Sequence, residues 1–151
     1  MNVPDYIERL YAGFAQAPKP ERSEITPHRC GECDEVTARL FPYVARDVPD
    51  EDMLWLGDSL PLLSAKAYRF YLSRFIEFTL ISPHCSADAV INYNLAPSDD
   101  LDTGDRNRFV GFTEGERCLV REFVEYRTSL EEHSHDQPYL ESARAFWSHA
   151  A

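Results

Sequence analysis

The sequence has few lysines, few glycines and no long apolar run. Only Lys19 and Lys66 among its 15 basic residues are lysines, while 26 residues are acidic, which gives a formal net charge of −11. Such a charge repels nucleic-acid phosphates and anionic lipid surfaces, so we expect no nucleic-acid partner and no membrane partner. A basic protein partner suits this charge better.

No stretch approaches the about 18 consecutive apolar residues of a transmembrane helix. The first residues, MNVPDYIERLYAGF, hold neither a basic segment nor an unbroken apolar segment, so we expect no signal peptide. A cytoplasmic location follows as the expectation. In that compartment the four cysteines, Cys30, Cys33, Cys85 and Cys118, would be reduced thiols.

Apolar residues make up 44% of the chain and aromatic residues 13%, which is typical of a folded protein. A length of 151 residues fits one domain whose core needs no disulfide. We predict a single helical domain over residues 1–151. It has an N-terminal helix within 1–16, a proline-containing loop over 17–27 and a main body over 28–149.

Caps, prolines and apolar residues at helical spacing predict an all-α fold, an irregular bundle of six or seven helices with at most a minor β ribbon. The expected helices begin near Pro4, at the Cys-Gly-Glu-Cys tetrapeptide, after the caps Asp50, Ser64, Ser86 and Thr113, and near Pro138. The helix after Ser64 should be central, with Tyr71, Leu72 and Phe75 buried together. The strand-like segment 108–112 is too short to make a sheet alone.

The best candidate site is a Cys-x-x-Cys with a histidine two residues before it, His28-Arg-Cys-Gly-Glu-Cys33. Two thiolates at this spacing can bind one soft metal ion, and His28 can supply a third ligand. A tetrahedral zinc site needs a fourth ligand, which His84, Cys85 or water would provide. Zinc is therefore the candidate cofactor, with His28, Cys30, Cys33, His84 and Cys85 as candidate ligands.

Two other interpretations of the same cysteines stay open. The simpler one is a pair of ordinary reduced thiols. The other is thiol redox chemistry, because a helix N-terminus at Cys30 would lower the pKa of that thiol. Redox motifs of the thioredoxin type follow a buried strand, however, and no such run precedes Cys30.

Two further polar segments invite a metal interpretation. Residues 131–136 contain a His-x-His between carboxylates, and residues 99–105 contain four aspartates. The second segment fails the EF-hand pattern, because its glycine and its bidentate glutamate are not at the required positions. We expect both segments to be solvated loops.

Three stretches carry a resemblance to a known family. They are His28–Glu35 (HRCGECDE), Leu60–Leu72 (LPLLSAKAYRFYL) and Phe112–Phe123 (FTEGERCLVREF). Together they resemble an uncharacterised bacterial family of short cytosolic proteins, defined only as a domain of unknown function, over roughly residues 25 to 130. The resemblance implies a bacterial origin and one domain, and it assigns no activity.

The sequence has no nucleophile elbow, phosphate-binding loop, dinucleotide fingerprint or His-Glu-x-x-His. This absence favours a non-catalytic role and leaves open whether the protein is an enzyme. The leading hypothesis is an acidic protein-interaction module, accessory or immunity-like. The alternative is a metal-binding or thiol-redox protein centred on Cys30 and Cys33.

Overall fold

The structure is a computed structural model that describes residues 1–82, 91–97, 107–130 and 135–149. Six α-helices lie in these ranges: α1 (Val3–Phe14), α2 (Gly31–Leu40), α3 (Asp50–Leu56), α4 (Ala65–Ile81), α7 (Glu114–Ser129) and α8 (Gln137–His149). Residues 91–93 are helical as well. The short 3-10 turns are η1 (Arg22–Glu24), η2 (Ala45–Asp47), η3 (Leu60–Leu62) and η4 (Asn107–Phe109). The described ranges contain no strand, which confirms the all-α prediction.

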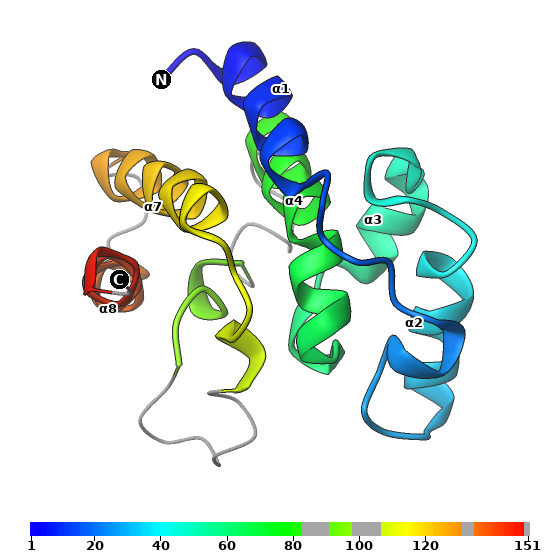
Figure 1. Cartoon of the computed structure of the whole chain (residues 1–151). Coiled ribbons are helices and arrows are strands. Elements are labelled where there is room, and N and C mark those ends of the chain that lie inside the picture. The colour runs from blue at the N-terminus through cyan, green and yellow to red at the C-terminus, as the bar shows by residue number, and fades with distance from the viewer. Residues whose placement is uncertain (83–90, 98–106, 131–134, 150–151) are drawn as a thin grey trace.

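Helix α4 lies in the middle of the molecule (Figure 1). Helices α2 and α3 lie on one side of it and helices α7 and α8 on the other, and α1 packs on both α4 and α7. The predicted central residues Tyr71, Leu72 and Phe75 are all at most 1% exposed and belong to one hydrophobic core. The prediction of a central, buried helix is confirmed.

Helix α4 begins where the sequence predicts. The Ser64 hydroxyl caps it by accepting a hydrogen bond from the Ala67 N–H at 3.1 Å. Further along, the Tyr71 hydroxyl donates to the backbone carbonyls of Leu40, the last residue of α2, and of Tyr43. Helix α4 is therefore tied by hydrogen bonds, as well as by apolar packing, to the segment that carries the Cys-x-x-Cys.

The predicted capping box of α7 is also present. The Thr113 hydroxyl accepts from the Glu116 N–H at 3.2 Å, and the Glu116 carboxylate accepts from the Thr113 N–H at 2.7 Å. Glu116 is 1% exposed, and the guanidinium of Arg69 on α4 donates to both of its carboxylate oxygens. The box thus joins α7 to α4 as well as starting α7.

Two local predictions need correction. Asp50 is the first residue of α3 and Pro49 occupies the cap position, so Asp50 does not cap the helix. The segment 108–112 forms no strand, and its first two residues belong to the 3-10 turn η4. The predicted loop 17–27 has the three-residue turn η1 within it.

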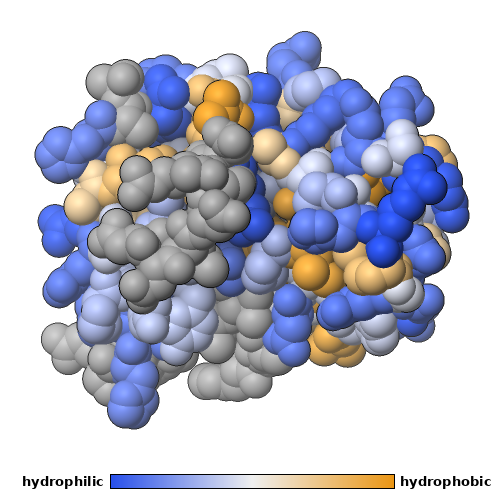
Figure 2. All heavy atoms as spheres, turned by 90° about the horizontal axis from the view of Figure 1, so that it is seen from below, coloured by the Kyte–Doolittle hydropathy of each residue, from blue (hydrophilic) through white to orange (hydrophobic). Residues whose placement is uncertain are grey.

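Several predictions fall outside the described residues. They include the start of the helix after Ser86, the aspartate-rich segment 99–105 and most of the His-x-His segment, of which His135 is described as exposed. None of the helices in the described ranges combines the length and the hydropathy needed to cross a bilayer. On the face drawn in Figure 2, apolar areas are small and separated by hydrophilic ones.

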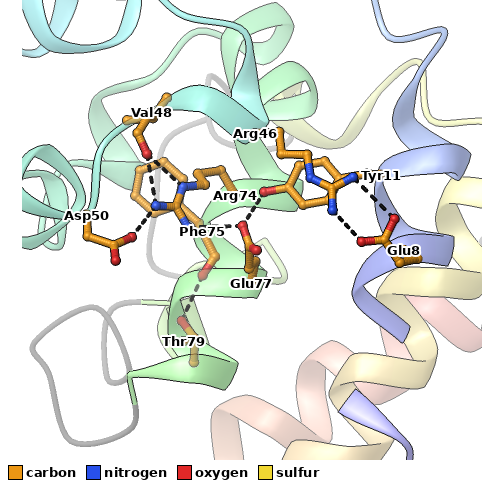
Figure 3. A network of polar contacts seen from close by, with 9 residues as sticks. All are labelled: Glu8, Tyr11, Arg46, Val48, Asp50, Arg74, Phe75, Glu77 and Thr79. Carbon is orange, nitrogen blue, oxygen red and sulfur yellow. Dashed lines mark hydrogen bonds and ion pairs between the residues drawn. The ribbon is translucent and has the colours of Figure 1, made fainter. Parts of the chain in front are cut away.

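A network of polar contacts fixes α3 and α1 to α4 (Figure 3). Arg74 of α4 is 5% exposed, and its guanidinium donates to the backbone carbonyl of Val48 at 2.9 and 3.0 Å. The same group pairs with Asp50 at 2.5 Å and with Glu77 at 3.0 Å. The buried positive charge is thereby satisfied by two carboxylates and one carbonyl.

The same network continues to α1. The Tyr11 hydroxyl donates to the Glu77 carboxylate, and burial of Tyr11 together with that carboxylate raises the pKa of Tyr11. Arg46 stacks on the Tyr11 ring, 4.9 Å from its centroid, and pairs with Glu8. This outer pair is more than half exposed on both sides, so it contributes less than the Arg74 contacts.

Candidate thiol site at the N-terminus of helix α2

The segment before α2 is attached to the start of α4. The Ser64 N–H donates to the Ile25 carbonyl at 2.9 Å, and the Ser64 hydroxyl donates to the Glu24 carbonyl at 2.5 Å. Lys66 pairs with the Glu24 carboxylate at 2.7 Å. These contacts fix the chain a few residues before Cys30.

Cys30 is the N-cap residue of α2. Its backbone is extended, and its Sγ accepts a hydrogen bond from the Cys33 N–H at 3.3 Å. Cys30 is exposed, whereas Cys33, one turn into the helix, is only 1% exposed. The motif therefore presents one accessible thiol and one buried thiol at the start of a helix.

The two thiols differ in acidity because each acts on the other. The Cys33 thiol and the Cys33 N–H both donate to the Cys30 sulfur and lower the pKa of Cys30, in that order of importance, while the Glu32 carboxylate opposes them. The pKa of Cys33 is raised, because its proton is shared with Cys30, because it is buried, and because of the negative charge on Cys30. Cys30 is thus the more acidic of the two thiols and Cys33 the less acidic one.

Thr26 is a site residue that sequence reasoning missed. Its hydroxyl donates to the His28 carbonyl at 3.1 Å, and Thr26 acts on the pKa of Cys33 in the lowering direction, against the larger effects that raise it. No feature of the sequence indicates this role, because a threonine four residues before a Cys-x-x-Cys is an ordinary loop residue.

The structure brings together only part of the predicted zinc ligands. Cys30 and Cys33 are adjacent, and His28 is exposed on the segment before them. His84 and Cys85 lie outside the described residues. Within the residues that are described, no three side chains of His, Cys, Asp or Glu are placed together to hold a metal ion. The zinc site with His28 as ligand stays a prediction.

Two other features lie elsewhere. Cys118 is half-buried on α7, across α4 from α2, with Arg121 and Glu114 at 3.6 Å from its sulfur. A hollow of about 300 Å³ is lined by Glu125, Thr128, Ser129 and Arg144, residues of α7 and α8. Neither brings two thiols together as the start of α2 does.

The chain is an all-α protein with an exposed and a buried thiol at the start of one helix. It belongs to the family of unknown function DUF6714, whose model matches residues 23–151. The expected resemblance to a family without assigned activity is confirmed, and the matched segment includes the thiol motif but not α1. Comparison with curated proteins and with solved structures found no match.

Proposed function

We propose that Cys30 and Cys33 form a thiol–disulfide exchange pair, in which Cys30 attacks and Cys33 resolves. One observation carries the proposal: the exposed Cys30 sulfur caps α2 and accepts hydrogen bonds from the buried Cys33. These contacts lower the pKa of Cys30 and raise that of Cys33. The reactive form of a cysteine is the thiolate, and accessible low-pKa thiols at helix N-termini are the reactive ones.

The exchange proceeds in two steps. The Cys30 thiolate attacks one sulfur of a partner disulfide RS–SR′, a mixed disulfide Cys30–SR forms, and R′S⁻ leaves and takes a proton from solvent. Cys33 then loses its proton to solvent and attacks the Cys30 sulfur, releasing RS⁻, which is protonated in turn. The partner disulfide is reduced by two electrons to two thiols, and the Cys30 and Cys33 thiols are oxidised to one disulfide.

The asymmetry of the pair supports this order of attack. Cys33 is buried one turn into α2 and cannot reach a bulky disulfide, whereas Cys30 is exposed at the N-cap. In the reverse direction, an incoming thiolate attacks the exposed Cys30 sulfur of the disulfide and displaces Cys33, which takes up a proton again. A bacterial cytoplasm is the proposed compartment, because its thiol buffers keep such a pair reduced between turnovers.

The test measures the redox equilibrium of the pair in glutathione buffers by mass spectrometry with peptide mapping. We expect reversible formation of the Cys30–Cys33 disulfide at a potential of about −180 to −300 mV, the range of cellular thiol pairs. Cys33→Ser should trap a mixed disulfide on Cys30, Cys30→Ser should abolish the reaction, and the matched control Cys118→Ser should behave as wild type. A Cys30 that reacts no faster than Cys118 refutes the proposal.

The same preparation separates the thiol function from the zinc alternative. Zinc bound in a one-to-one ratio after purification with a weak chelator, and protection of both thiols from alkylation until that zinc is removed, would favour a structural metal site. Metal-free protein with a freely alkylated Cys30 would favour exchange.

An acidic, non-catalytic interaction module is the second candidate, and one observation favours it. Leu54 and Trp55 on α3 are 61% and 42% exposed, on a chain of net charge −11. An exposed apolar pair on an acidic surface suits a basic protein partner. Affinity purification from the native cell tests this function: we expect a basic protein that is retained by wild type and lost with Leu54→Ser. Retention that is equal for both forms contradicts it.

A further inference from the structure

We infer that the partner of the thiol pair is a protein or peptide disulfide flanked by basic residues, because the charges around Cys30 select against anionic disulfides. The inference rests on the proposed thiol–disulfide exchange and names the substrate class of that same site. Its basis is the arrangement of charged side chains in the first turn of α2 and in the segment attached to it.

The charges nearest the thiol are predominantly negative once ion pairs are removed. Glu24 pairs with Lys66, and Glu35 shares Arg39 with Asp52. Glu32 and Asp34 are exposed in the first turn of α2, and no ion pair engages either of them within the described part of the chain. On the other side of Cys30 stands Arg29, with His28 adding a charge only when it is protonated.

Glu32 is the carboxylate whose charge reaches both sulfurs. The negative charge of this side chain raises the pKa of both Cys30 and Cys33, whereas the Glu32 backbone N–H acts on Cys30 in the lowering direction. Arg29 is not among the causes of either shift. A disulfide that approaches Cys30 therefore meets a negative local field, added to the negative charge of the whole chain.

This field favours cations beside the disulfide that is attacked. Both the attacking and the leaving sulfur carry negative charge during exchange, so a neighbouring cation in the partner is attracted by Glu32 and also stabilises the leaving thiolate. One unit charge at about 6 Å in water changes an encounter by about three-fold, and two such charges by about ten-fold. Glutathione disulfide, which carries a net negative charge, is disfavoured by the same amounts.

The surface around Cys30 admits a macromolecule. Residues 27–32 are all exposed, and a side chain placed on Gly31 would meet nothing within 4 Å. No groove has to be filled before the sulfur is reached. A disulfide in a basic loop of another protein can therefore approach Cys30 directly. A small anionic disulfide finds no pocket whose contacts would offset its repulsion by the carboxylates.

The experiment compares three small disulfides with the reduced wild-type chain: cationic cystamine, neutral hydroxyethyl disulfide and anionic glutathione disulfide. The rate of each disulfide with the protein at low ionic strength is divided by the rate of the same disulfide with 2-mercaptoethanol. This ratio removes differences in the intrinsic reactivity of the disulfides. We expect cystamine to be favoured over glutathione disulfide by about ten-fold or more, falling towards unity in about 1 M salt, where charges are screened within about 3 Å. A pair of cysteine peptides, flanked by arginines or by glutamates and oxidised to disulfides, extends the comparison to the proposed substrate class.

Variants assign the preference to the first turn of α2. Glu32→Gln combined with Asp34→Asn should reduce the preference at least three-fold, while Glu125→Gln, an exposed carboxylate on α7, should leave it unchanged. The neutral disulfide reports any change in the nucleophilicity of Cys30 itself. Equal normalised rates, or a preference that the double variant does not alter, overturn the inference and leave the exchange function standing. A Cys30 that reacts with none of the disulfides overturns both.

Discussion

Replacing Arg74 with methionine tests whether a buried charge holds α3 against α4. The substitution keeps an unbranched apolar side chain of similar length and removes every donor. The buried Val48 carbonyl loses both of its guanidinium hydrogen bonds, and an unsatisfied buried acceptor costs about 1–3 kcal/mol. Glu77, whose side chain is 17% exposed, keeps its hydrogen bond from the Tyr11 hydroxyl but loses the one from the guanidinium. Loss of a hydrogen bond between charged groups costs about 1.5–3 kcal/mol.

Asp50 adds little to this sum, because its side chain is 68% exposed and water replaces the guanidinium. The expected loss in the free energy of unfolding is therefore about 3–5 kcal/mol, the range found when one member of a buried ion pair is removed. Arg46→Met is the matched control in the same network. The Arg46–Glu8 pair is more than half exposed on both sides, so that change should cost less than about 1 kcal/mol.

The assay is urea unfolding followed by tryptophan fluorescence and circular dichroism, with both variants measured beside wild type. A second substitution, Glu77→Gln in the Arg74→Met background, should recover part of the loss, because it removes the carboxylate left without its cation. If Arg74→Met costs no more than Arg46→Met, the network in Figure 3 does not stabilise the fold and the reasoning from burial is wrong.

Three more predictions address the core and the site. Phe75→Ala should lower the free energy of unfolding by about 3–5 kcal/mol, as large-to-small changes in a packed core do, and an unchanged melting temperature would contradict the central place of α4. Because the pKa of Cys30 is lowered, its alkylation by iodoacetamide should rise with pH to a midpoint below the value of about 8.5 of a free cysteine, and a midpoint at or above that value argues against the cap. If Cys30 and Cys33 bind zinc with His28 as a ligand, a strong chelator should increase hydrogen exchange over residues 25–41 alone, and the absence of any change would exclude the metal site.

Local signals predicted the starts of helices and the central face of α4. Ser64 and the Thr113–Glu116 box were found because a cap and its partner lie three residues apart. Such an interaction can be recognised from a short stretch of sequence. Phe75 and its neighbours were found because the apolar spacing of that segment fits a helix almost all round. These features depend little on the rest of the chain.

Long-range contacts account for what the sequence did not reveal. Asp50 has the residue type of a cap, but Arg74, 24 positions further along the chain, takes its carboxylate and Pro49 occupies the cap position. At the site, the spacing of Cys30 and Cys33 was evident, whereas their unequal burial results from how α2 packs in the folded chain. Sequence reasoning therefore found the two thiols and missed the difference between them.

Helix α1 lies outside the segment matched by the family, yet its side chains share the core of that segment. Tyr6 and Leu10 are fully buried, and the Tyr6 hydroxyl donates to the Leu119 carbonyl in α7 at 2.8 Å. The stretch that relatives have in common is thus shorter than the stretch that packs together. A version trimmed to residues 23–151 would uncover the apolar flanks of α4 and α7 to water. In this chain α1 is what supplies the apolar cover for those flanks.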